Sequence, residues 1–186
     1  MFMELYKSID DLLKSKELVV IAIEGGSASG KTTLAEELKQ KYKCTVLHMD
    51  DFFLRPEQRT KERLSEPGGN VDRERFYDEV VISLINKEKI TYRRFDCSTF
   101  SVLPAVEIEP DRLIIVEGAY SMHPYLGKYY DLAVFLEIDP ILQKERILIR
   151  NGQEKAKRFL EEWIPMEQKY FETMKVTEKC DLVLQV

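Results

Sequence analysis

The sequence predicts an α/β fold in which helices cover both faces of a mostly parallel sheet, which is a three-layer α/β/α arrangement. Short apolar runs alternate with helical periodicity in the order β-α-β-α-(β)-β-β-α-β. A glycine-rich loop joins the first apolar strand to the helix that follows it. Because 186 residues suit one domain with a sizeable core, we treat residues 1–186 as a single domain.

Composition restricts the partners of the chain. Charged residues make up 33% and hydrophobic residues 44%, which is typical of a globular protein. The formal net charge of −5 predicts no nucleic-acid partner, because such binding needs a basic surplus. No apolar run approaches the roughly 18 residues of a membrane helix. Acids at Glu4, Asp10 and Asp11 interrupt any signal-peptide pattern, so a cytoplasmic location is expected.

The first elements are a helix over 3–16, packed beside a buried strand over 18–24, and the loop after that strand. The loop fits G-x-x-x-x-G-K-[ST], the phosphate-binding P-loop, in which backbone N–H groups, a lysine and the hydroxyl of a magnesium ligand meet the phosphates. The alternative is an ordinary glycine-rich turn. The residues predicted to bind the nucleotide are Gly25, Gly26, Ser27, Ala28, Ser29, Gly30, Lys31, Thr32 and Thr33.

A second buried strand over 45–49 ends at Asp50-Asp51-Phe52-Phe53. The carboxyl ends of parallel strands are where ligands bind in open α/β sheets. Two acids there suit a general base and a magnesium or water contact in phosphoryl transfer, although an acidic turn is the simpler alternative.

The next segments surround this predicted site. Residues 54–70 are polar and proline-rich, so we expect a surface loop at its mouth. Apolar spacing predicts a helix over 72–86, with Asp72 as its N-cap. The β-prone residues of 90–100 predict a hairpin or strand pair over the site.

A buried strand over 113–116 carries Glu117 at its carboxyl end, in the position of a Walker B acid near Mg²⁺, unless it is only a solvent-facing strand end. After a strand over 132–138, the helix 141–150 places Arg146 and Arg150 on one face. That pair suits a clamp on the transferred phosphoryl group, although an ordinary solvated face is the alternative.

The last part of the chain predicts a short lid and a final strand. Residues 152–158 are polar and form a candidate lid, roughly 150–160, for excluding water. A helical segment over 159–174 is interrupted at Pro165, and 180–184 forms the last strand. The guanine-reading motif Asn-Lys-x-Asp of GTPases is absent, because Asn86-Lys87-Glu88-Lys89 lacks the Asp.

These motifs resemble the uridine kinase and phosphoribulokinase family of P-loop kinases, including the nicotinamide riboside kinases. The resemblance runs from the first strand to the last. It rests on Gly25 to Thr33, His48 to Phe53, Val71-Asp72, Val116-Glu117-Gly118, Arg146 with Arg150, and Trp163 to Tyr170.

The resemblance implies a nucleoside- or nucleotide-kinase-like fold, with ATP and Mg²⁺ as cofactors. Asp50 matches the base for a nucleoside 5′-hydroxyl, and Thr32, Glu117 and Asp50 lie near the metal. Lys31 matches the catalytic P-loop lysine, while Arg146 and Arg150 match lid arginines that face the phosphates. Phe53 and Asp72 match substrate contacts. Tyr92 and Arg94 become substrate-binding candidates, because Tyr92-Arg93-Arg94-Phe95-Asp96 corresponds to the base-reading hairpin.

Several departures concern the acceptor. Asp51 and Phe53 replace the Ser and Tyr of uridine kinases, as in riboside kinases, and Asn151 replaces an Asp after the lid arginine. The expected activity is a kinase acting on a primary hydroxyl, most simply that of a ribonucleoside. Nicotinamide riboside, pantothenate and a sugar phosphate are alternative acceptors, and a nucleotide-binding regulator without transfer activity is an alternative function. Members differ in oligomeric state, which leaves a homo-oligomer open.

Overall fold

The computed structural model describes residues 2–186, so of the predicted single domain only Met1 lies outside the described residues. Its helices and strands are, in chain order, α1 Met3–Ser15, β1 Val19–Gly25, α2 Lys31–Tyr42, β2 Thr45–His48, α3 Lys61–Ser65, α4 Arg73–Phe76, α5 Ile82–Asn86, β3 Ile90–Asp96, β4 Ser101–Ile108, β5 Leu113–Glu117, β6 Leu132–Glu137, α6 Pro140–Arg158, α7 Ile164–Met174 and β7 Leu182–Gln185.

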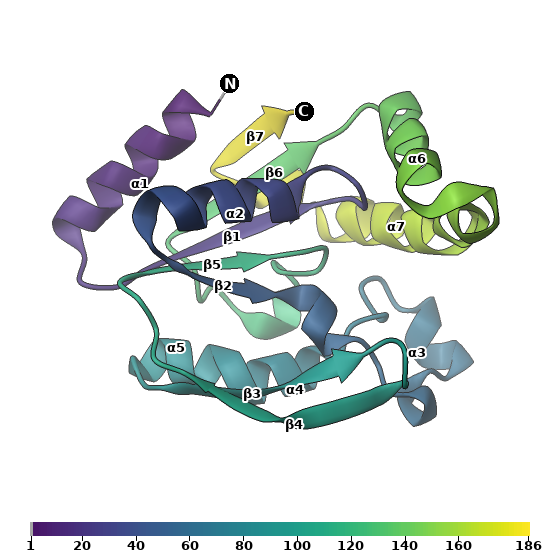
Figure 1. Ribbon diagram of the computed structural model, residues 1–186, viewed down its shortest axis with the longest axis horizontal. Coiled ribbons are helices and arrows are strands. Elements are labelled where there is room, and N and C mark those ends of the chain that lie inside the picture. The colour runs from purple at the N-terminus through teal and green to yellow at the C-terminus, as the bar shows by residue number, and fades with distance from the viewer. Residues whose placement is uncertain (1) are drawn as a thin grey trace.

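The central sheet has five strands in the order β2-β5-β1-β6-β7, and every neighbouring pair is parallel. Strand β1 lies in the middle because Val19 to Ile23 are apolar on both faces and every residue of the strand is buried. Figure 1 shows α1 and α2 on one side of this sheet, and α4, α5 and the β3–β4 hairpin on the other. The predicted three-layer α/β/α fold is therefore confirmed.

Two hydrophobic layers hold the helices to the sheet. On one face, Leu5 and Ile9 of α1 and Leu34 and Leu38 of α2 pack against Ile21 of β1. The other face packs against α4, α5, α7 and the hairpin, through residues that include Phe76, Val80, Leu84, Tyr92 and Tyr170. All of these side chains are buried. The strands are continuous apolar runs whose side chains point to the two faces of the sheet in turn, so the same strands supply both layers.

Three segments differ from their predicted form. The expected loop 54–70 contains α3, because Thr60 Oγ1 accepts a hydrogen bond from Arg63 N at 3.1 Å and begins a helical turn. The predicted polar lid 152–158 is helical, as the continuation of α6 to Arg158, with one break at Gly152. The second hairpin strand extends to Ile108, well beyond the expected end of the hairpin near residue 100.

The helical segment near Pro165 agrees with its prediction from the sequence. The helical path changes just before Pro165, where a π-helical turn over Phe159–Trp163 precedes α7. Pro165 lies in the first turn of α7, where its missing N–H costs little. Across residues 2–186, no helix combines the length and the apolar character that a membrane crossing requires.

Candidate active site

A cavity of about 680 Å³ opens where the parallel strands end, between the P-loop, β2, β5 and the α6–α7 region. Its walls include P-loop residues from Ser27 to Thr33, Asp50 and Phe53 after β2, Glu117 to Tyr120 after β5, Arg146 and Arg150 of α6, and Trp163 and Glu167. The sequence therefore brings its phosphate loop and its two strand-end acids, Asp50 and Glu117, to one cavity.

The P-loop has the backbone that its glycines permit. Gly25 has φ +146°, and a Cβ on it would lie 2.7 Å from the carbonyl oxygen of Leu136. The loop ends at Gly30, after which Lys31 begins α2, so the N-terminus of that helix meets the cavity. Free N–H groups and the helix dipole at this point favour an anion such as a phosphate.

Two polar side chains of the loop support the same chemistry. Lys31 Nζ donates to the carbonyl oxygen of Gly26 at 2.8 Å, inside the curve of the loop. Ser29 Oγ is buried and has no hydrogen-bond partner within residues 2–186. A buried hydroxyl without a partner costs free energy unless a ligand completes it. The P-loop therefore combines a lysine at the cavity, which fits a phosphate, with a buried hydroxyl that no described group satisfies.

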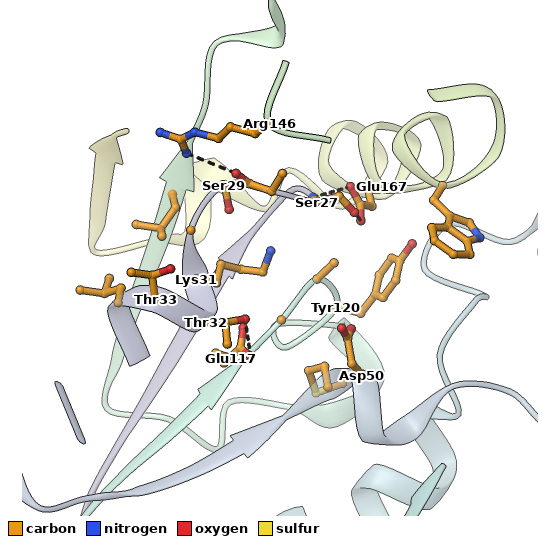
Figure 2. Close-up of a pocket in the computed structure, with 18 of the residues that line it drawn as sticks. Ser27, Ser29, Lys31, Thr32, Thr33, Asp50, Glu117, Tyr120, Arg146 and Glu167 are labelled. Atoms are coloured by element: carbon orange, nitrogen blue, oxygen red, sulfur yellow. Dashed lines mark hydrogen bonds between the residues drawn. The ribbon is translucent and has the colours of Figure 1, made fainter. Parts of the chain in front are cut away.

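Thr32 and Glu117 meet at the cavity wall, as Figure 2 shows: Thr32 Oγ1 donates to Glu117 Oε1 at 3.1 Å. His48 Nδ1 lies 2.6 Å from the same oxygen, and this contact raises the pKa of His48. Hydroxyl and carboxylate oxygens are the ligands that Mg²⁺ prefers. Within residues 2–186 no three His, Cys, Asp or Glu side chains form a metal site of their own. The donor set therefore fits a Mg²⁺ ion shared with phosphate oxygens.

Asp50 follows β2 in a tight turn over Met49–Phe52 and lines the cavity. No group in the described residues 2–186 forms a hydrogen bond to its carboxylate. Water reaches Asp50 through the cavity, but the surrounding protein desolvates it and raises its pKa, while the charge of Lys31 acts in the opposite direction. A carboxylate with a raised pKa and no protein partner is suited to accept a proton from a bound molecule.

The neighbouring acid, Asp51, has a different environment. Its Oδ2 accepts from the Tyr92 hydroxyl at 3.3 Å and lies 3.6 Å from Arg94 Nε. Tyr92 is buried and stacks on Phe52 with ring centroids 5.6 Å apart. Neither Tyr92 nor Arg94 lines the cavity of Asp50. The structure therefore joins these two substrate candidates to Asp51 and not to the P-loop cavity.

The other two substrate candidates lie in different places. Phe53 lines the cavity beside Asp50. Asp72 is buried and caps α4 by accepting from Arg75 N at 3.2 Å, as its N-cap prediction requires. Its other oxygen pairs with Arg75 Nε at 3.3 Å, and it borders a second cavity beneath the hairpin.

Arg146 and Arg150 both line the main cavity from α6. Arg146 Nη1 donates to the carbonyl oxygen of Ala28 in the P-loop at 3.2 Å. The guanidinium of Arg150 lies 5.2 Å from the ring centroid of Phe159 and donates to Asn151 at 2.8 Å. Arg146 therefore contacts the P-loop directly, whereas Arg150 contacts residues of its own helical segment.

Sequence reasoning missed Glu24, a carboxylate with no exposed surface beneath the P-loop. Its Oε1 accepts from Gly25 N at 3.1 Å and Tyr120 N at 3.0 Å, and its Oε2 accepts from Met122 N and Tyr170 Oη, each at 3.1 Å. Burial nevertheless raises the pKa of Glu24 to about 7. An acid at the end of an apolar strand was the available signal.

Glu167 of α7 lies within the motif Trp163 to Tyr170, and the sequence alone assigns it no role. Its carboxylate accepts from Ser27 N at 2.8 Å and from Ser27 Oγ at 2.6 Å (Figure 2). Gln143 of α6 donates to the carbonyl oxygen of Ser27 at 2.7 Å. The helices that follow β6 therefore fix the third residue of the P-loop. No spacing in the sequence predicts these contacts, because they join residues more than a hundred positions apart.

Comparison with known proteins gives a consistent result. Residues 20–162 match the model of the phosphoribulokinase / uridine kinase family. The uridine kinase of Geobacillus kaustophilus is 27% identical over 86% of this chain and 83% of its own length. The uridine kinase of Mycoplasma pneumoniae is 26% identical over 92% and 87%.

Among solved structures, one described as a possible uridine kinase from Bacillus stearothermophilus superposes with a TM-score of 0.69. It shares 24% identity and covers 98% of this chain and 100% of its own. At that identity the likeness concerns the fold, which is the same arrangement of sheet and helices.

Proposed function

Because the chain belongs to the phosphoribulokinase / uridine kinase family, we propose that it is an ATP- and Mg²⁺-dependent kinase for a primary hydroxyl of a small acceptor. The observation that carries the proposal is Asp50, a carboxylate with no hydrogen-bond partner among residues 2–186, in the same cavity as Lys31 and the P-loop. The 5′-hydroxyl of a ribonucleoside is the first acceptor to consider, since the two relatives described above are uridine kinases.

In this proposal Asp50 orients the acceptor hydroxyl and takes its proton. The hydroxyl oxygen forms a bond to the γ-phosphorus while the bond from that phosphorus to the β–γ bridging oxygen breaks, and ADP leaves. Lys31, Arg146 and Arg150 would stabilise the negative charge on the transferred group. Thr32, Glu117 and Asp50 would hold Mg²⁺, which when bound neutralises charge on the phosphate oxygens.

Nicotinamide riboside, pantothenate and a sugar phosphate remain alternative acceptors, and a nucleotide-binding regulator remains an alternative function. The predicted cytoplasmic location and the absence of a nucleic-acid partner belong to the same proposal, which is compatible with a monomer or a homo-oligomer.

Release of ADP tests the kinase activity directly. The wild-type protein with ATP and Mg²⁺ is given uridine, cytidine, nicotinamide riboside, pantothenate and simple sugars in turn. We expect ADP release that depends on one acceptor. Binding of ATP without acceptor-dependent release from any compound would favour the regulator.

Asp50→Asn tests the assignment of the base. Loss of a general base lowers turnover by about 10²–10⁴-fold, so we expect kcat to fall by at least about a hundredfold while the Kd for ATP stays within about threefold. Asp51→Asn is the matched control, because the Asn oxygen still accepts from Tyr92. Its kcat should stay near that of the wild type, and equal losses in the two variants would contradict the assignment.

A further inference from the structure

Four tyrosines are buried, and their hydroxyl groups differ in whether they form a hydrogen bond. Buried tyrosines usually find a hydrogen-bond partner. Three of the four do so: Tyr92 donates to Asp51, Tyr129 to the carbonyl oxygen of Ser121, and Tyr170 to Glu24. The hydroxyl of Tyr120 has no partner within residues 2–186, although only 4% of this residue is exposed.

The backbone of Tyr120 is held in an unusual conformation. Its φ is +76°, a region that residues other than glycine rarely enter and that costs about 1–3 kcal/mol. Glu24 holds this conformation by accepting from Tyr120 N at 3.0 Å, and the ring packs on Tyr170 with centroids 5.0 Å apart. Strain that persists at a cavity suggests that the direction of the side chain matters.

The side chain of Tyr120 points into the active-site cavity. Tyr120 lines the same cavity as Asp50, and Figure 2 shows it between Asp50 and Glu167. Burial, and then the negative charges of Glu167, Glu24 and Asp50, raise the pKa of the Tyr120 hydroxyl and keep it protonated. Its O–H is therefore a donor beside the proposed base.

The charges around the cavity are unevenly placed. Among the described residues that line it, the cationic side chains are Lys31, Arg146 and Arg150, and Lys31 and Arg146 contact P-loop carbonyl oxygens. The side near Tyr120 has the carboxylates of Asp50 and Glu167. Arg59 is not a lining residue, and it donates to Asn70 at 3.2 Å and lies 3.8 Å from Glu162. An anionic group of an acceptor beside Tyr120 would therefore face the carboxylates of Asp50 and Glu167.

We propose that Tyr120 is an acceptor-binding residue that donates a hydrogen bond to an oxygen of the acceptor, and that the acceptor is a hydroxyl compound without a negative charge. This inference rests on the proposed kinase function. It excludes carboxylated and phosphorylated acceptors and keeps nucleosides, free sugars and other neutral or cationic compounds.

Tyr120→Phe tests the role of the hydroxyl, because it keeps the ring and its packing on Tyr170. With the acceptor found by ADP release, we expect kcat/KM for the acceptor to fall about 3- to 15-fold, as for a lost hydrogen bond. The KM for ATP should not change. Tyr129→Phe is the matched control, since it removes a buried hydroxyl that bonds to Ser121. It should lower thermal stability and leave both KM values near those of the wild type.

Matched pairs of compounds test the charge of the acceptor. The pairs are uridine with uridine 3′-monophosphate, pantothenol with pantothenate, and glycerol with glycerate, each assayed with the wild-type protein. We expect the neutral member of any pair that is used to have at least about a tenfold higher kcat/KM, because a desolvated charge without a partner is costly.

The outcomes separate this inference from the proposed function. Acceptor-dependent ADP release with unchanged kinetics in Tyr120→Phe overturns the role of Tyr120 and leaves the kinase standing. Preference for an anionic acceptor overturns the stated acceptor class in the same way. Absence of acceptor-dependent ADP release from every compound overturns the kinase function and this inference with it.

Discussion

Glu24 is fully buried, whereas glutamate side chains usually lie at the protein surface. Water is excluded from its carboxylate, which raises the pKa to about 7, while hydrogen bonds from backbone N–H groups and from Tyr170 act in the opposite direction. One side chain thus connects the P-loop at Gly25 with the strained backbone of Tyr120. The position of the acceptor-binding tyrosine depends on an acid that never meets the cavity.

This buried acid should make stability depend on pH. The ordinary pKa of Glu is about 4.3, so between pH 4.3 and 7 the folded protein keeps a proton that the unfolded chain has lost. The contribution of Glu24 is fully present below pH 4.3 and is lost as pH rises through 7, at up to about 1.4 kcal/mol per pH unit. From pH 5 to 7 we expect the free energy of unfolding to fall by about 2 kcal/mol more in the wild type than in Glu24→Gln.

Urea unfolding at pH 5, 6, 7 and 8 measures this difference. Other groups that titrate in the same range cancel when the variant is subtracted from the wild type. Glu36→Gln, at an exposed position of α2, is the control and should reproduce the wild-type profile. Parallel profiles for the wild type and Glu24→Gln would show that Glu24 does not titrate in this range.

Among the elements, α6 has the most distinctive feature, a single break in an otherwise helical path. Gly152 has φ +72° and ψ +166°, a region essentially restricted to glycine. Arg146 and Arg150 precede the break, Phe159 and Trp163 follow it, and all four line the cavity. The angle at Gly152 therefore sets the arginines relative to the aromatic pair, whose centroids are 4.3 Å apart.

Gly152→Ala should change catalysis through this angle. A Cβ at Gly152 meets no atom within 4 Å, so the substitution adds backbone strain alone, worth about 1–3 kcal/mol. We expect kcat to fall by at least about threefold with the acceptor identified by ADP release. The control is Gly127→Ala, at φ +67° in a turn outside the cavity, where a Cβ is equally unhindered. That variant should lose stability but keep its kcat, and equal kinetics in the two variants would count against a role for the bend.

At the scale of the molecule, the two hydrophobic layers share one sheet. Every strand of the parallel sheet is bonded to its neighbours, and β1 contributes buried side chains to both layers. The P-loop, the strand-end acids and the α6 arginines all converge on one cavity of this unit. Neither layer could lose its packing without exposing the strand that carries the P-loop.

Thermal unfolding tests this unity. We expect one cooperative transition, because no part of the sheet has a core of its own. ATP with Mg²⁺ at about 100 times its Kd should add about 2.7 kcal/mol and raise the Tm by about 5–10 °C. A second transition that ATP leaves in place would contradict the single domain.

The sequence predicted the sheet well, because each of its strands is a short run of apolar residues, and this pattern is typical of a buried strand. It also placed Thr32 and Glu117 near the same predicted metal, and the structure brings their side chains into contact where the strands end. Local rules sufficed for the N-cap at Asp72 and for the helical change near Pro165.

Contacts between distant segments were beyond such rules. The bonds of Glu167 to Ser27 and of Tyr170 to Glu24 depend on where α7 crosses the sheet, which periodicity does not specify. The unpartnered hydroxyl of Tyr120 depends in turn on a backbone angle that no tyrosine prefers. The helical form of residues 152–158, the candidate lid, was not predicted because exposed, charged residues resemble a loop when no partner surface is known.

The order of the strands has a consequence for the making of the protein. Strand β1 is bonded to β5 and β6, and Ile21 pairs with Leu132, roughly 110 residues later in the chain. At a synthesis rate of about 5–20 residues per second, the ribosome takes roughly 5–20 s to supply that partner. Its other neighbour, β5, is complete only at Glu117, so for most of this interval the apolar segment before the P-loop has no neighbouring strand and the nucleotide loop takes shape late in synthesis.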